Sequence, residues 1–128
     1  MQYGFSKIVN YSYEQAVEKV TEELKKEGFG VLTTIDVKET MKKKLDVDFK
    51  KYIILGACNP PLAHKALTAE VELGLLLPCN VIVYVNDQGK TVVGFFDPKL
   101  MAHLVENKEL NNIAEEVYSK LQRVYLAL

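Results

Sequence analysis

The chain has 128 residues, of which 48% are apolar and 26% charged, and its formal net charge is −1. This length and composition predict one globular domain, residues 1–128, with a substantial hydrophobic core. The absence of a basic excess argues against nucleic acid as a partner, because phosphate-binding surfaces are usually basic.

The N-terminal segment is too polar for a secretory signal, and no apolar run is long enough to cross a bilayer. We therefore expect a cytoplasmic protein without a membrane partner. In that compartment the two cysteines, Cys58 and Cys79, are expected to stay reduced rather than to form a stabilising disulfide.

Hydrophobic periodicity predicts a chain in which strands and helices are mixed. We expect five strands, at residues 3–9, 31–35, 52–58, 79–85 and 91–96. We expect helices at residues 13–27, at 37–45, from 60 onward, at 98–105 and at 110–128. Residues 70–78 are predicted to form a connector with a helical start and an irregular end.

Capping signals mark the helix ends. Ser12 and Gln15 have the spacing of a capping box, and Gly28 stands where the first helix should end. Asn59 and Asp97 each precede a proline, which is the pairing of a cap residue with the favoured first residue of a helix.

The first and last helices are long and amphipathic, so both can cover one face of a five-stranded sheet. This arrangement predicts a two-layer α+β domain with short helices inserted between the strands. Three of the strands, 52–58, 79–85 and 91–96, have apolar residues on both faces of the predicted sheet. The uncovered sheet face would then be a large apolar patch, which predicts a homodimer.

Cys58 ends a predicted strand and comes directly before a helix N-terminus. Free N–H groups and the helix dipole at such a position favour negative charge and lower the pKa of a thiol. With the amide of Asn59, the same position could bind an anion or a carboxylate. The alternative is structural, with Cys58 as a small core residue and Asn59 as a helix cap alone.

Cys79 opens the next apolar strand and is followed by Asn80. If strands 52–58 and 79–85 pair in antiparallel fashion, the two cysteines lie at one end of the sheet. The predicted ligand-binding site therefore consists of Cys58, Asn59, Cys79 and Asn80. A redox pair is the alternative for the two thiols.

Metal binding and catalysis are further possible roles for these residues. Cys58, Cys79 and His64 are candidate metal ligands, but structural zinc usually takes four ligands and the chain has no CxxC motif. We therefore expect no metal and no cofactor. Cys58 is the candidate catalytic nucleophile, although His64 lies more than a turn from the helix cap and is expected to be solvated.

Three short strings carry a family resemblance. They are ILGACNP at residues 54–60, LLLPCN at residues 75–80 and DP at residues 97–98. Together they resemble the bacterial and archaeal family named domain of unknown function 302. The resemblance implies a TBP-like β-α-β(4)-α fold that forms dimers, and it implies no activity. Its marker positions in this chain are Cys58, Asn59, Pro60, Pro78, Cys79 and Asn80.

The sequence therefore predicts a homodimeric module that binds a small ligand or an anion near the CNP and LPCN segments. A thiol-dependent enzyme or redox protein that uses Cys58 is the second hypothesis. A purely structural dimer is the third.

Overall fold

The structure, a computed structural model, describes residues 2–128. Its strands are β1 (Gly4–Val9), β2 (Gly30–Asp36), β3 (Tyr52–Cys58), β4 (Cys79–Val85) and β5 (Thr91–Phe96). Its helices are α1 (Tyr13–Lys26), α2 (Val37–Leu45), α3 (Pro60–Ala69), the 3-10 helix η1 (Val71–Leu76), α4 (Lys99–Leu104) and α5 (Glu109–Ala127). The predicted element order is confirmed, and η1 replaces most of the expected connector.

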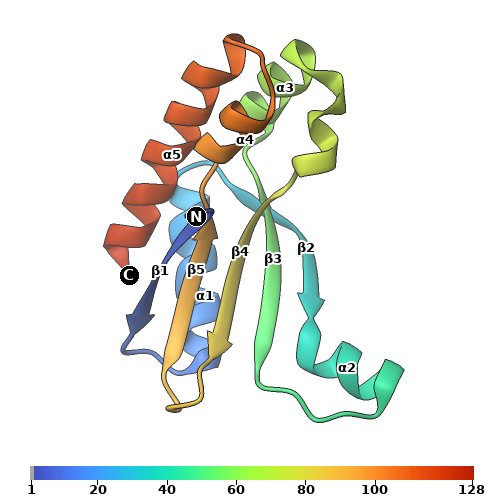
Figure 1. Ribbon diagram of the computed structural model, residues 1–128. Coiled ribbons are helices and arrows are strands. Elements are labelled where there is room, and N and C mark those ends of the chain that lie inside the picture. The colour runs from blue at the N-terminus through green and yellow to red at the C-terminus, as the bar shows by residue number, and fades with distance from the viewer. Residues whose placement is uncertain (1) are drawn as a thin grey trace.

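The five strands form one antiparallel sheet in the order β1-β5-β4-β3-β2. The long helices α1 and α5 lie together against one face of this sheet (Figure 1). The fold is thus the predicted two-layer α+β arrangement. The shorter helices are inserted between strands or between strand and helix, as the β-α-β(4)-α description requires.

Helix α1 begins and ends at the residues that its sequence predicts. The Ser12 hydroxyl accepts from the Gln15 N–H at 3.1 Å, and the Gln15 side chain accepts from the Ser12 N–H. At the other end Gly28 has φ +84°, a conformation that residues with a Cβ rarely adopt. Ala16, Val20 and Leu24 face the sheet and are fully buried.

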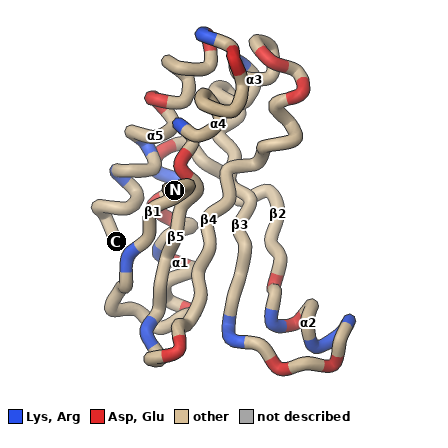
Figure 2. Tube along the Cα trace, viewed as in Figure 1, with Lys and Arg blue, Asp and Glu red and all other residues tan. Residues whose placement is uncertain are grey.

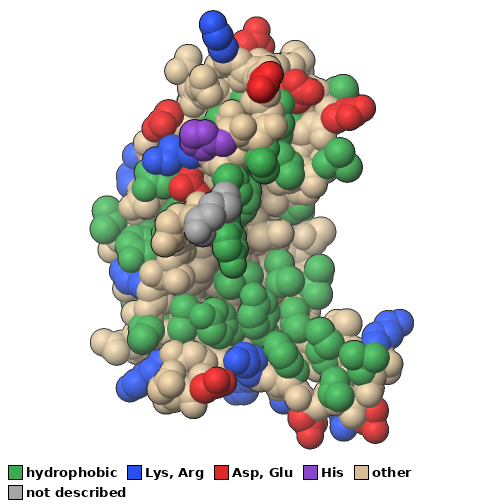
Figure 3. All heavy atoms as spheres, viewed as in Figure 1, with side chains coloured by type: hydrophobic (Ala, Val, Ile, Leu, Met, Phe, Trp, Pro, Cys, Tyr) green, Lys and Arg blue, Asp and Glu red, His purple; other side chains and the backbone are tan. Residues whose placement is uncertain are grey.

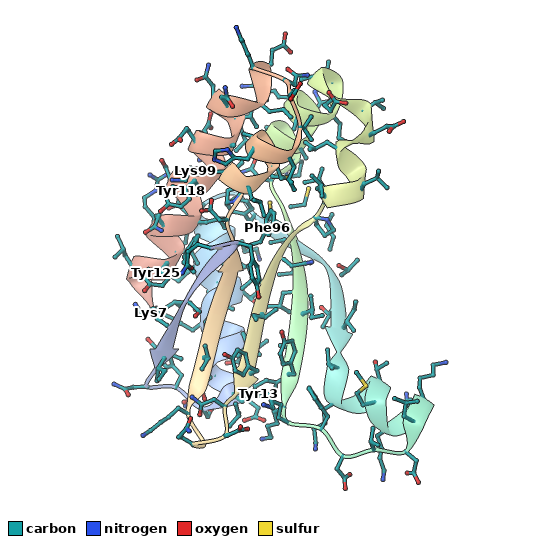
Figure 4. The ribbon with its side chains drawn as sticks, in the orientation of Figure 1. Lys7, Tyr13, Phe96, Lys99, Tyr118 and Tyr125 are labelled. Atoms are coloured by element: carbon teal, nitrogen blue, oxygen red, sulfur yellow. The ribbon has the colours of Figure 1, made fainter. Side chains whose placement is uncertain are left out.

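An aromatic cluster packs α5 against strands β1 and β5 of the sheet. The Phe5 ring stacks on Phe95 at 5.3 Å between ring centroids, and the Tyr118 and Tyr125 rings meet Phe5 edge-on. Lys7 also connects β1 to α5, because its Nζ donates to the Tyr125 carbonyl at 2.9 Å (Figure 4).

Helices α3, η1 and α4 lie together beyond one end of the sheet, where they form a helical cap next to the start of α5 (Figure 1). Asn107 joins the two halves of this cap, since its Nδ2 donates to the Ala69 carbonyl at 2.8 Å. At the opposite end, α2 projects beside β2 and buries none of its residues. We call residues 37–49 the α2 arm.

Charged residues gather on the helices and loops, and the middle of β3, β4 and β5 is free of them (Figure 2). Between residues 2 and 128, no helix combines the length and apolar character that a membrane span requires.

Candidate functional site

Strands β3 and β4 bring the two cysteines to one end of the sheet. They pair in antiparallel register with Ala57 opposite Cys79, so Cys58 is the next residue along. Residues directly opposed in this way have Cα atoms about 4.5–5.5 Å apart. Both thiols are free; Cys58 is partly exposed and Cys79 is buried.

The start of α3 does not offer the anion site that the sequence predicts. Pro60 and Pro61 occupy its first two positions and have no N–H group. The Leu62 N–H donates to Asn59 Oδ1 at 3.3 Å, and the Ala63 N–H donates to the Asn59 carbonyl at 2.8 Å. The first turn therefore has no unpaired N–H for an anion.

Asn59 uses its side-chain amide within the fold. Besides capping α3, its Nδ2 donates to the Glu27 carbonyl at the end of α1, at 3.2 Å. Asn59 is nearly buried, so both ends of the amide have partners where water has little access. Asn59 therefore acts as a helix cap, as the structural hypothesis expects, and it also links the end of α1 to the start of α3.

A cavity of about 340 Å³ lies between the end of the sheet and the helical cap. Its lining is almost entirely apolar, and Thr33 and Asn59 are the only lining residues with hydroxyl or amide side chains. Three sequence-predicted residues, Cys58, Asn59 and Cys79, line it. The other lining residues are Phe29, Leu32, Thr33, Ala57, Leu62, Ala63, Ala66, Leu67, Leu73, Gly74, Leu77, Pro78, Met101, Leu110, Ile113, Ala114 and Val117.

Burial makes Cys79 a poor thiolate. Loss of solvent raises the pKa of its thiol to about 11, and the neighbouring Cys58 contributes in the same direction. At neutral pH Cys79 is therefore a protonated, apolar-like side chain in the cavity wall.

The structure places Asn80 away from the other predicted site residues. Because side chains alternate along a strand, Asn80 faces the side of the sheet opposite Cys79. It lines a separate hollow of about 480 Å³ on the open sheet face, together with Tyr52 and Tyr84. Asn80 is therefore outside the cavity that Cys58, Asn59 and Cys79 line.

The two histidines also lie apart from the cavity. His64 and His103 are exposed, and neither is among the lining residues. Across residues 2–128 no group of three or more His, Cys, Asp or Glu side chains has a metal-binding arrangement. His64 is thus not among the residues that line the cavity with the two cysteines.

Most cavity residues give no local signal in the sequence. Leu73, Met101 and Ile113 come from three elements, η1, α4 and α5, and each has the spacing of an ordinary core position. Only the packing of the helical cap on the sheet brings them to the two cysteines.

Fold and site together define a class of protein, a two-layer α+β domain with an apolar cavity beside paired strand-end cysteines. The family model described as domain of unknown function DUF302 matches residues 5–128, and the chain belongs to this family.

A solved structure supports the same assignment. The chain is similar to an uncharacterised conserved protein DUF302 from Bacillus stearothermophilus, with 29% sequence identity and a TM-score of 0.91. The likeness covers 99% of this chain and 98% of that one. A comparison with curated proteins gave no significant match.

Proposed function

We propose that this protein is a homodimeric binding module that holds an apolar small molecule in the cavity beside Cys58 and Cys79. The cavity itself carries the proposal. At about 340 Å³ it lies within the range of small-molecule sites, which are concave and mostly apolar. Tightly packed protein interiors contain few voids of that size.

The surroundings of the cavity favour an uncharged ligand over an anion. Its walls hold no Lys, Arg, Asp, Glu or His side chain. The nearest helix N-terminus has its donors removed by proline or already paired. A charged group placed there would lose its hydration without a partner, which is costly.

The same features support binding over thiol catalysis. A nucleophilic cysteine needs a base or another group that stabilises its thiolate. His64, the candidate partner of Cys58, is exposed and does not line the cavity. Cys79 is held in the thiol form by burial.

Binding of an uncharged fluorescent dye, N-phenyl-1-naphthylamine, tests the ligand site. We expect saturable binding of one dye molecule per chain with enhanced emission. Ala66→Phe places a ring into the cavity from α3 and should abolish binding. Ala127→Phe adds the same ring at an exposed position on α5 and should leave binding unchanged. Equal binding by both variants would contradict the proposal, provided circular dichroism shows both folded.

The dimer is proposed through the open face of the sheet. Outward strand positions there are uncharged: Gly4, Ser6, Ile8, Thr33, Ile35, Tyr52, Ile54, Gly56, Asn80, Ile82, Tyr84, Val92, Gly94 and Phe96. Ile8 and Ile35 are 58% and 50% exposed. The apolar surface continues from this face onto the α2 arm, where Leu45 is 66% exposed (Figure 3).

A second copy of this chain suits such a face. A two-fold interface brings each residue near its own counterpart or its neighbours, so a charged patch would repel itself and an uncharged apolar patch does not. Tyr52 and Tyr84, whose ring centroids are 5.3 Å apart, provide a large apolar area on the two adjacent strands β3 and β4.

Sedimentation velocity tests the dimer. We expect the wild-type chain to sediment as a dimer and Tyr84→Glu as a monomer, because the carboxylate would be buried unpaired. Leu126→Glu, at an exposed position on α5, is the control and should remain dimeric. A monomeric wild type at micromolar concentration would overturn this part of the proposal.

A further inference from the structure

The cavity has an exposed end and a buried end. Leu32 and Thr33 line it from β2 and are both exposed, so its mouth lies beside this strand. Met101 on α4 and Leu110 and Val117 on α5 also line it, and all three are buried. The cavity therefore runs inward from an exposed end at β2 to a buried end at α4 and α5.

A break in the regular pairing of β2 with β3 shapes the mouth. Val31 lies opposite Ala57 and Thr33 lies opposite Gly56, so Leu32 is an extra residue without a partner on β3. Such a bulge bends the strand and redirects its side chains. Leu32 and Thr33 both line the cavity, so the bulge brings one apolar side chain and one hydroxyl to its mouth.

The sheet side of the cavity wall crosses the ends of three strands. Thr33, Ala57 and Cys79 line it from β2, β3 and β4, which are neighbours in the sheet. Neighbouring strands are about 4.7–4.9 Å apart, so this wall is about 10 Å across. An apolar cavity of about 150 Å³ takes up one benzene molecule. At about 340 Å³, this cavity has room for an extended chain of about ten carbon atoms.

Aliphatic groups dominate the wall. Among the lining residues that the structure describes, Phe29 alone carries an aromatic ring, whereas ten are Leu or Ala. An aromatic ligand gains part of its binding from protein rings that stack on it or meet it edge-on, and this wall offers one ring. A saturated chain gains from many weak contacts with aliphatic groups on all sides. The wall therefore favours a saturated chain over a ring system.

Thr33 offers the ligand a polar contact at the mouth. The amide of Asn59 is already used within the fold. A hydroxyl group can donate and accept hydrogen bonds, so Thr33 can pair with an uncharged hydroxyl. A carboxylate is disfavoured, because the described lining holds no cation and the exposed Glu72 is next to the lining residue Leu73.

We propose that the ligand of this cavity is a long-chain primary alcohol. Its saturated chain, of about ten carbons, runs toward α4 and α5, and its hydroxyl lies at Thr33. The hydroxyl then keeps contact with water at the mouth, so no polar group of the ligand is buried without a partner. This inference rests on the proposed binding function and names the ligand class for the same cavity.

Isothermal titration calorimetry of the full chain tests the ligand class. From 1-hexanol to 1-decanol we expect the affinity to rise about fourfold for each added CH₂ group. Decanoate, which differs from 1-decanol in its head group, should bind at least about tenfold more weakly, because its charge finds no partner. Decahydro-2-naphthol has the same number of carbons in two compact rings. It should also bind at least about tenfold more weakly, because it leaves part of the wall uncovered.

Thr33→Val tests the position of the hydroxyl, because it removes that group and keeps the shape of the side chain. We expect 1-decanol to bind about two- to tenfold more weakly, the net contribution of one hydrogen bond, and the dye to bind as before. Thr34→Val is the matched control, on the same strand and exposed but outside the lining, and should bind 1-decanol as the wild type does. Equal affinities of the two variants for 1-decanol would overturn the inference.

The outcomes separate this inference from the proposed function. We expect 1-decanol to displace the dye and to lose its binding in Ala66→Phe. If the dye binds but 1-decanol binds no more tightly than decanoate or decahydro-2-naphthol, the alcohol is wrong and the apolar site stands. If neither the dye nor 1-decanol binds, the proposed function itself is wrong.

Discussion

The Asn59 side chain connects the end of one helix to the start of another. Its Nδ2 donates to the Glu27 carbonyl at 3.2 Å, and its Oδ1 accepts from the Leu62 N–H at 3.3 Å. One amide thus satisfies a carbonyl beyond the end of α1 and an N–H in the first turn of α3. The link also holds the wall of the cavity that Asn59 and Leu62 share.

Replacing this amide should destabilise the protein in steps. We expect Asn59→Ala to lower the free energy of unfolding by about 1–3 kcal/mol, because a helix cap and a buried hydrogen bond are both lost. Asn59→Ser keeps the cap and loses the link to Glu27, so its effect should be intermediate. Urea unfolding measures both, with the exposed Asn112→Ala as the control. A stability of Asn59→Ala equal to wild type would contradict the role of the amide.

The two thiols should react at different rates. Iodoacetamide attacks the thiolate, and Cys79 is buried with a pKa raised to about 11, whereas Cys58 is partly exposed. At neutral pH we expect mass spectrometry of the native protein to find Cys58 alkylated first and Cys79 protected. Both should react in urea. Faster labelling of Cys79 in the native protein would show that its burial is wrong.

Alkaline pH should destabilise the fold through ionisation of Cys79. Burial raises the pKa of the Cys79 thiol from 9.0 to about 11 in the folded protein. Below pH 9 the thiol is protonated in both the folded and the unfolded chain, so the free energy of unfolding does not depend on its ionisation there. Above that pH the unfolded chain releases the proton and the folded chain retains it, so stability falls until the folded thiol also ionises. The loss should be about 2–3 kcal/mol. Cys79→Ala should flatten the decline in urea unfolding over this interval, and an unchanged decline would contradict it.

Tyr13 should extend the alkaline loss. The pKa of its hydroxyl is raised to about 12 by burial, with Asp36 and Glu14 contributing. The loss of stability caused by Tyr13 should therefore appear at higher pH than the loss caused by Cys79. It should still be present in the Cys79→Ala variant. Tyr13→Phe, which keeps the ring and removes the ionisable group, should abolish that remaining share.

Gly56 should tolerate no side chain. A Cβ there would overlap the Thr33 hydroxyl and lie 2.8 Å from the Pro78 ring. We expect Gly56→Ala to cost about 1–3 kcal/mol, because this contact leaves no room to relax in a paired strand. Gly30→Ala is the matched control in the neighbouring strand, where a Cβ meets nothing within 4 Å. Thermal unfolding compares the two, and equal melting temperatures would refute the crowding.

Local sequence signals determined the elements of this fold. The Ser12–Gln15 capping box, the glycine at position 28 and the Asn59–Pro60 pair act over three or four residues, so their effects can be recognised without the rest of the chain. The apolar runs of β3 and β4 also indicated two buried neighbours. If these two strands pair in antiparallel fashion, Cys58 and Cys79 lie at the same end of the sheet, and the structure has this pairing.

Tertiary packing decided which side chains and hydrogen-bond donors are available at the end of β3 and β4. Asn80 follows Cys79 directly, yet strand alternation turns it to the other face of the sheet. The Asn59 amide is used by a carbonyl that lies 32 residues away, and the two prolines together with that pairing remove the anion site. The cavity arises only where the helical cap meets the sheet. Met101 joins the cavity lining in the same way, because contacts between distant segments depend on how whole elements pack and not on local spacing.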